Sequence, residues 1–261
     1  MKSLFWQADS LRLHAVDHGG GGRPVVLLHG VTGHARVWDA VAPALAGAGR
    51  VIAVDLRGHG ESQWSAEGRY TTADHTADLL ALLDLLDTPV DLVGLSWGGL
   101  VAVHTAALQP QRVRRLAVLD VPLSFTQGED QVPRRPGAFG SHREVWRWER
   151  DANRFAPEPM IDTLAWHGVR PGPGGRLERR HDPYFLTRWP FRRDDRGREF
   201  AALTTPALLV HGAESPVLDA DTAERTAGLR AGVRLVHLKR CGHLVPVDAP
   251  DQLALVLQEF L

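Results

Sequence analysis

The stretch Gly94-Leu95-Ser96-Trp97-Gly98 places a serine between two glycines, where an apolar strand runs into a helix. Glycines two residues before and two after Ser96 remove side chains that would clash in so tight a turn. Such a turn holds the serine exposed at the carboxyl end of a sheet, where open α/β sheets bind ligands. The helix start behind it adds positive potential for an oxyanion. The pattern predicts a nucleophilic serine, and the alternative is a serine that only caps a helix.

Three further stretches resemble motifs of the α/β-hydrolase superfamily, and they occur in the family's order. The resemblance covers nearly the whole chain apart from residues 122–199. It is carried by "LLHGVTGHARVWDAVAPAL" (27–45), similar to the family's His-Gly oxyanion segment, by "VIAVDLRGHGES" (51–62), similar to its Asp-x-Arg-Gly-His-Gly-x-Ser loop, and by "CGHLVPVDAPDQLALVLQEFL" (241–261), similar to its Gly-His segment and last helix.

The resemblance implies a Ser-His-acid mechanism. His243 follows the last predicted strand, in a loop ended by Pro246, and can approach Ser96 across the top of the sheet as general base. The implied oxyanion hole consists of the backbone N–H of Trp97, the residue after the nucleophile, and that of Val31. Such donors typically contribute about 10²–10³ in rate each.

The sequence leaves open which carboxylate is the third member of the Ser-His-acid mechanism. The family usually places it about three residues beyond Gly212, where this chain has Ser215, which holds no negative charge at neutral pH. Displaced acids in the superfamily lie at the end of the strand after the nucleophile helix, which here ends in Asp120. We therefore expect Asp120 to orient His243. The alternatives are Glu214, then Asp219 at a predicted helix start, or no functional acid.

The remaining polar residues favour structural roles. His29, Asp55, Arg57 and His59 are expected to fix loops, and His104 to be a packed histidine. The histidines show no metal-ligand spacing, so no metal site is expected, and no pattern indicates a cofactor. The lone Cys241 is a conceivable rival nucleophile, but no glycine turn holds it.

The elements that must position these residues alternate between short apolar runs and stretches of helical period. The runs are rich in Val, Leu and Ile on both faces, which is typical of buried parallel strands. Strand–helix alternation predicts an α/β fold with a mostly parallel, doubly wound sheet. The stretch "RLHAVDHGGGGRP" (12–24) indicates one leading strand and a glycine turn, and this strand is expected to be antiparallel at the sheet edge. The predicted strands are 24–30, 50–58, 90–96, 114–122, 206–212 and 233–238, and the predicted helices are 35–48, 71–87 with Thr72 as N-cap, 98–109, 219–231 and 248–261.

Residues 122–199 interrupt this alternation with many prolines and few strand-like runs. A structureless loop of that length is implausible in a compact domain. We expect an inserted, mostly helical cap with helices at 141–155 and 157–168, and a hydrolase core from residues 1–121 and 200–261. The arginines of the cap are interleaved with acids, which favours a solvated face over carboxylate recognition. The cap also contains Trp146, Trp148, Trp166 and Trp189, which should roof the substrate site.

The composition of the chain indicates which kinds of binding partner and cellular location to expect. The chain has 261 residues with 30 basic and 31 acidic side chains, and its net charge of −1 gives no electrostatic case for nucleic acid or an anionic membrane. A single cysteine fits a reducing compartment. We find no apolar run long enough for a signal peptide or a spanning helix. The expectation is a soluble, cytoplasmic protein with a small-molecule substrate, and the oligomeric state is not indicated.

A serine at the turn argues against dehalogenases and epoxide hydrolases of this superfamily, which use an aspartate there. Esters, lactones, thioesters and some C–C bonds next to a carbonyl all react through an oxyanion that this site could stabilise. We predict a serine hydrolase that cleaves a partly apolar acyl substrate through an acyl-enzyme. Two alternatives stay open: a C–C bond hydrolase, and a hydrolase scaffold that binds or rearranges a small molecule without hydrolysis.

Overall fold

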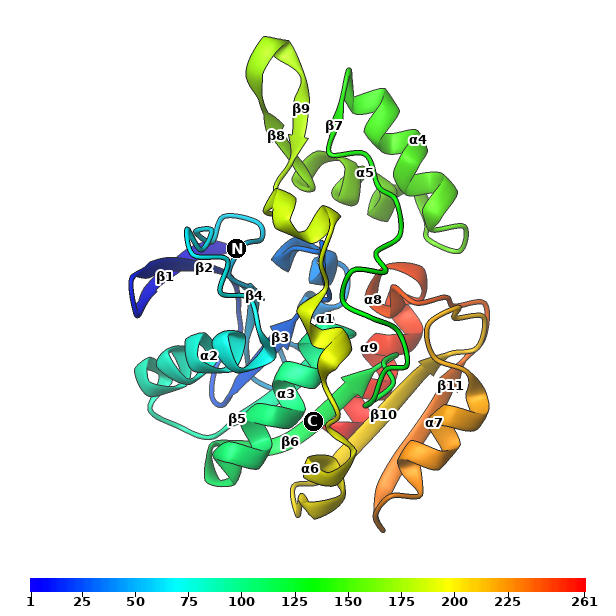
Figure 1. The fold of residues 1–261 in the computed structure, drawn as a ribbon. Helices are drawn as coiled ribbons and strands as arrows, with labels where there is room; N and C mark the ends of the chain where they lie inside the picture. The colour runs from blue at the N-terminus through cyan, green and yellow to red at the C-terminus, as the bar shows by residue number, and fades with distance from the viewer.

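A computed structural model describes residues 1–261 and contains a central eight-stranded sheet (Figure 1). The strand order is β1-β2-β4-β3-β5-β6-β10-β11, and every pair from β4 onwards is parallel. The first two strands form an antiparallel hairpin at one edge. The strands are β1 (Lys2–Ala8), β2 (Leu11–Gly19), β3 (Pro24–Leu28), β4 (Arg50–Asp55), β5 (Val90–Leu95), β6 (Val113–Leu119), β10 (Ala207–Gly212) and β11 (Val233–Leu238).

Helices cover both faces of this sheet (Figure 1). Two hydrophobic cores result: one lies under α2 and α3, and the other under α1 and α9. Strands β3 and β5 are buried along their whole length because both faces are covered. The helices of the core are α1 (Ala42–Leu45), α2 (Thr72–Leu86), α3 (Trp97–Leu108), α6 (Gly197–Ala202), α7 (Ala220–Ala227), α8 (Val245–Asp248) and α9 (Pro250–Phe260). The predicted α/β fold with a mostly parallel, doubly wound sheet is confirmed.

Residues 138–179 form an upper layer, drawn above the sheet in Figure 1. It contains the two expected helices, and a small antiparallel sheet of order β7-β9-β8 accompanies them. The segment after β9 descends in short 3-10 turns along α3 and leads into α6. The elements are β7 (Ala138–Phe139), α4 (His142–Ala152), α5 (Glu158–His167), β8 (Val169–Pro171) and β9 (Leu177–Arg179), with 3-10 turns at Pro173–Gly175, Pro183–Leu186 and Pro190–Arg193.

Several sequence expectations need correction. The helix expected at 35–48 is only a 3-10 turn (Ala35–Trp38) and the single-turn α1, because Pro43 has no N–H with which to continue a helix. Two leading strands pair where one was expected. The N-cap of α2 is Thr71, which forms a capping box with Asp74. Thr72 instead accepts a hydrogen bond from Trp97 Nε1 at 2.8 Å.

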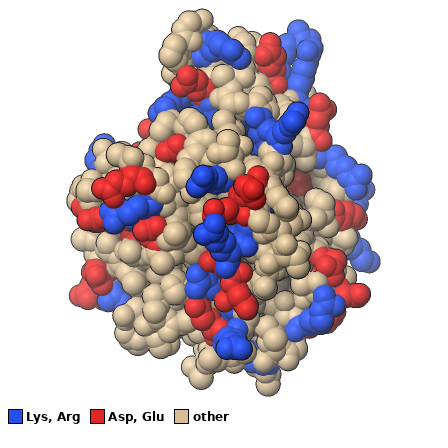
Figure 2. Space-filling model, viewed as in Figure 1, with Lys and Arg blue, Asp and Glu red and all other residues tan.

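The surface carries both signs of charge close together. On the face drawn in Figure 2, acidic and basic side chains alternate over the core and the upper layer. Surface pairs include Arg234 with Glu259 at 2.6 Å and Arg193 with Glu129 at 2.7 Å. No helix combines the length and the apolarity needed to cross a bilayer.

Candidate active site

Ser96 occupies the turn between β5 and α3 in a backbone conformation that non-glycine residues rarely adopt. Its φ is 53° and its ψ is −125°. The glycines on either side are required by close packing. A Cβ atom on Gly94 would lie 2.2 Å from Gly98 O, and a Cβ atom on Gly98 would lie 2.6 Å from His29 O. The strained turn therefore exists because both flanking positions lack side chains.

The loop after β3 lies directly against Ser96. A Cβ atom on Gly30 would meet Ser96 Cβ at 2.8 Å and Ser96 Oγ at 3.4 Å. The next residue, Val31, donates its N–H to no protein atom. Trp97 is the first residue of α3, so its N–H also lacks a partner within the helix. Two unused backbone donors thus flank the serine, as the predicted oxyanion hole requires.

The structure brings Asp120 and His243 together. His243 Nδ1 lies 2.8 Å from Asp120 Oδ2, and Asp120 is fully buried. Asp120 follows β6 with a positive φ of 49°. Ser96 and Asp120 thus lie at the carboxyl ends of the neighbouring strands β5 and β6, while the loop after β11 supplies His243. No hydrogen bond joins Ser96 Oγ to His243, a contact that often tightens only when substrate binds.

Ser215, at the turn where an acid was expected, is bonded to Asp120. Its Oγ donates to Asp120 Oδ2 at 2.5 Å, and the N–H of Gly212 donates to Asp120 Oδ1 at 2.9 Å. Donors to a carboxylate stabilise its charged form. The β10 turn therefore supplies a hydrogen-bond donor to a carboxylate that comes from β6. Ser215 was not anticipated in this role, since only the tertiary packing of β6 against β10 reveals it.

The two alternative acids, Glu214 and Asp219, form hydrogen bonds with other groups. The carboxylate of Glu214 accepts the N–H groups of Arg240 and Cys241, at 3.1 and 2.9 Å. Asp219 caps α7 by accepting the N–H of Thr222 at 2.8 Å. Neither is hydrogen-bonded to His243. Cys241 is fully buried, and burial, with the charges of nearby carboxylates, raises the pKa of its thiol. A buried, protonated thiol is a poor nucleophile.

Asp248 is a further residue that the sequence did not single out. Its Oδ2 accepts the N–H of Gly242 at 2.9 Å, directly before His243. The other carboxylate oxygen, Oδ1, is buried without a partner. Burial raises the pKa of Asp248 to about 6, although the Gly242 hydrogen bond and the charge of His243 act in the opposite direction. Asp248 therefore holds the loop that carries the predicted base.

Neutral histidines hold the loop next to Ser96. His29 Nδ1 bonds to Gly30 O at 2.7 Å, and its Nε2 accepts the N–H of Leu56 at 3.1 Å. His59 Nδ1 bonds to Arg57 O at 2.9 Å, and its Nε2 accepts the N–H of Thr32 at 3.1 Å. A ring that donates from one nitrogen and accepts at the other must be uncharged. These contacts match the expected loop-fixing role.

Acid should therefore destabilise the fold. Burial is the largest cause that lowers the pKa of a group of interior histidines: His29, His34, His59, His75 and His181. Because each pKa is lower in the folded state than the ordinary 6.5, the unfolded chain binds more protons below pH 6.5, and stability falls as pH falls. His181 has a pKa of about 4 in the folded protein, and this residue alone should lower the free energy of unfolding by roughly 2 kcal/mol at pH 5.

Urea unfolding at pH 7.5 and pH 5 measures this loss. His75→Phe should reduce the pH dependence, because both ring nitrogens of His75 are buried without partners. The exposed His142 provides the matched control, and His142→Gln should leave the dependence unchanged. Equal stability at the two pH values would contradict the assignment of these histidines as neutral.

Aromatic side chains from residues 122–199 pack around the serine turn. Phe191 lies 5.1 Å from the ring of Trp97, and Phe185 stacks on His59 at 4.5 Å. Phe155 lies beside Gly242, since a Cβ atom there would be 3.8 Å from its ring. These residues thus contact the surroundings of Ser96, which is itself only 5% exposed.

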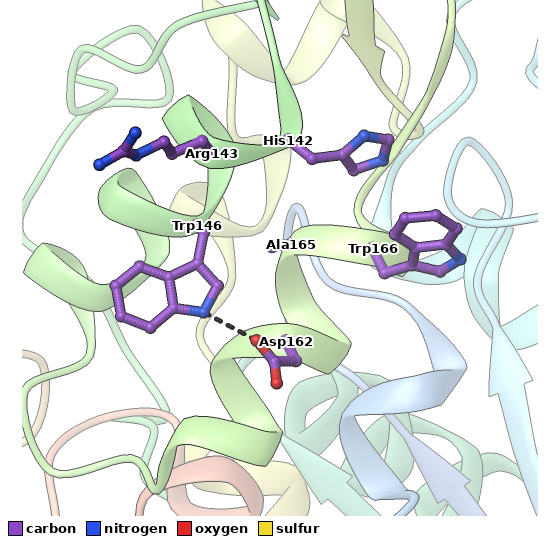
Figure 3. A pocket seen from close by; sticks show the side chains of 6 residues that line it. All are labelled: His142, Arg143, Trp146, Asp162, Ala165 and Trp166. Carbon is purple, nitrogen blue, oxygen red and sulfur yellow. Dashed lines mark hydrogen bonds between the residues drawn. The ribbon is translucent and has the colours of Figure 1, made fainter.

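A separate hollow of about 410 Å³ lies between α4 and α5 (Figure 3). Trp146 donates from its Nε1 to Asp162 Oδ1 at 2.8 Å on one side of it. On the other side, the ring of His142 stacks on Trp166 at 4.6 Å. Ser96, Asp120 and His243 do not line this hollow, so it is distinct from the candidate active site.

Comparisons with known proteins agree with this geometry. A family model described as "Alpha/beta hydrolase family" matches residues 25–255. The chain is 31% identical to Lipase LipV of Mycobacterium tuberculosis, over 95% of this chain and 97% of that one. It is 28% identical to 2-hydroxymuconate semialdehyde hydrolase of Pseudomonas sp. strain CF600, over 97% and 92%. The crystal structure of an esterase from Mycobacterium tuberculosis superposes with a TM-score of 0.82 at 27% identity, covering 99% of this chain and 90% of that one.

Proposed function

The chain belongs to the alpha/beta hydrolase family and is a hydrolase, and we propose that it cleaves an ester, lactone or thioester through a covalent acyl-enzyme. Ser96 would attack the substrate carbonyl, and His243 would take the serine proton and later deliver it to the leaving group. Asp120 would orient His243, while the N–H groups of Val31 and Trp97 would stabilise the oxyanion. The chemistry balances without a cofactor, since water releases the acyl group.

The observation that carries this proposal is the contact between His243 and Asp120. The 2.8 Å separation places the buried carboxylate on Nδ1, so Nδ1 carries the proton and Nε2 is left free to accept one. This tautomer is the one a general base for Ser96 needs. A histidine with a structural role alone would not need a buried carboxylate that also takes hydrogen bonds from Ser215 and Gly212.

We further propose that residues 122–199 are a cap over Ser96 that binds the apolar part of the substrate. Support comes from Phe185 and Phe191, which pack on the aromatic residues around the serine turn. The names of the relatives add to this proposal, because a lipase and an esterase both act on esters. A cytoplasmic location remains part of the proposal and rests on the single cysteine.

The similarity to 2-hydroxymuconate semialdehyde hydrolase keeps C–C bond hydrolysis as the second candidate function. Such a reaction would use the same serine and oxyanion donors on a carbonyl next to the broken bond. A scaffold that only binds its ligand is less well supported, because the strained serine turn and the buried acid would then serve no purpose.

A substrate panel separates the three candidates. We expect p-nitrophenyl butyrate, a matched thioester and a lactone to be turned over, with an initial burst if deacylation is slow. A vinylogous 1,5-diketone in the same panel should react at least tenfold more slowly than the best ester, in kcat/KM. A faster diketone would favour the C–C hydrolase, and binding of all compounds without turnover would favour the scaffold.

A further inference from the structure

Arg135 joins residues 122–199 to the loop beside Ser96. Its NH1 group donates to Thr32 Oγ1 at 2.9 Å. Thr32 lies two residues beyond Gly30, which abuts the side chain of Ser96. Because consecutive Cα atoms are 3.8 Å apart, the Cα atoms of Gly30 and Thr32 are separated by at most about 7.6 Å. The guanidinium therefore contacts the same loop that carries Gly30 and Val31.

The charge of Arg135 is not neutralised by this protein. No carboxylate lies within 4.0 Å of it, and Glu149, whose charge acts on it, is already paired with Arg179 at 2.6 Å. Arg135 is accessible to solvent, yet desolvation by surrounding protein lowers its pKa, and the charge of Arg179 acts in the same direction. An accessible guanidinium without a counter-ion can form charge-assisted hydrogen bonds to an anion.

Arg179 adds a second positive charge that acts on Arg135. Arg179 is 9% exposed, and its Nε donates to Pro136 O at 3.3 Å, next to Arg135 in the chain. Its NH1 bonds to Glu149, but its NH2 is buried without a partner. The neighbouring His181 adds no positive charge, because burial lowers its pKa to about 4. The unsatisfied hydrogen-bonding capacity here is that of guanidinium groups, which match carboxylates in geometry.

We propose that Arg135 binds a carboxylate of the substrate, so that this hydrolase prefers acyl compounds with an acidic group a few carbons from the cleaved carbonyl. This inference rests on the proposed function, since Ser96 sets where that carbonyl lies. The ring of Trp189, 5.7 Å from the Arg135 guanidinium, would flank the chain between the two groups. The interleaved charges of the cap favoured a solvated face. Arg135 differs from the neighbouring Arg134 because its guanidinium contacts the loop beside Ser96.

Two esters of equal shape test the preference. The first is the mono-p-nitrophenyl ester of adipic acid, and the second is p-nitrophenyl 6-methylheptanoate, in which an isopropyl group replaces the carboxylate. We expect Arg135→Gln to lower the ratio of kcat/KM for the acidic ester to that for the neutral ester by about tenfold to a hundredfold, as for a lost hydrogen bond to a charged group. Arg135→Lys, which keeps the charge, should restore part of the ratio.

The neighbouring Arg134 is exposed and makes no ion pair, so Arg134→Gln is the matched control and should leave the ratio unchanged. An unchanged ratio in Arg135→Gln would overturn the proposal. If kcat/KM fell equally for both esters, the ratio would be unchanged and Arg135 would have a structural role only. An equal fall in Arg134→Gln would overturn it as well.

Direct binding separates this inference from the proposed function. Calorimetry with adipate should give a Kd at least tenfold weaker for Arg135→Gln than for the wild type. If neither ester is hydrolysed but adipate binding depends on Arg135, the proposed reaction fails and the anion site stands. Equal affinity of the two proteins, or no binding to the wild type, removes the anion site whatever the esters show.

Discussion

Replacing Asp120 by asparagine is expected to lower kcat/KM on an activated ester by roughly 10²–10⁴. The amide that Asp120→Asn introduces would keep its oxygen towards the N–H of Gly212, which can only donate. Its NH₂ group would then face His243 Nδ1. Because two donors cannot bond to one another, the imidazole would shift its proton to Nε2 and lose the ability to accept the proton of Ser96.

The fold should survive this change, because asparagine has the shape of aspartate and the hydroxyl of Ser215 can rotate to accept from the new NH₂ group. We therefore expect a melting temperature close to that of the wild type. The matched control is Glu214→Gln, whose side chain binds Arg240 and Cys241 rather than His243, and it should stay within about tenfold of the wild type. A large loss in this control with an active Asp120→Asn would reassign the acid.

Replacing Ser96 by alanine is expected to have the larger effect, a loss of about 10⁴-fold or more in kcat on the same ester. The nucleophile would be absent, and only the oxyanion donors and substrate binding would remain. Alanine keeps the Cβ atom that packs against Gly30, so the tight turn should be retained. Circular dichroism should then match the wild type, while initial rates approach those of the uncatalysed reaction.

A variant that kept more than a tenth of the wild-type kcat would contradict the assignment of Ser96. Cys241 could not replace it without unfolding of its surroundings, since its thiol is fully buried. Such residual activity would instead indicate direct attack by water, with His243 as the base. If deacylation is slower than acylation, a burst of p-nitrophenol at high enzyme concentration should be present in the wild type and absent in Ser96→Ala.

The sequence predicts the parts of this site that depend on residues close together in the chain. Gly94 and Gly98 indicate the turn around Ser96, because close packing of the chain on itself excludes any side chain there. The strands at 24–30 and 90–96 are apolar on both faces because helices cover both. Asp120 could be named as a candidate because it lies at the end of a predicted strand. The choice between Asp120 and Glu214 depended on which side chain turns towards His243.

The parts that were missed depend on contacts between distant segments. Ser215 meets Asp120 only because β10 pairs with β6, and Arg135 meets Thr32 across 103 residues of chain. The helix expected at 35–48 had the right apolar spacing, but Pro43 interrupts its hydrogen bonds. The first strand was overlooked because β1 lies at the sheet edge and most of its side chains are exposed, which weakens the apolar pattern.

The central claim is that Ser96 is a nucleophile activated by His243, and covalent labelling tests it most directly. The protein should be incubated with a fluorophosphonate, digested, and analysed by peptide mass spectrometry. We expect a single adduct on the peptide that contains Ser96, formed more slowly in Asp120→Asn and absent in Ser96→Ala. Undiminished labelling of Ser96→Ala, or an adduct on another residue of the wild type, would contradict the claim.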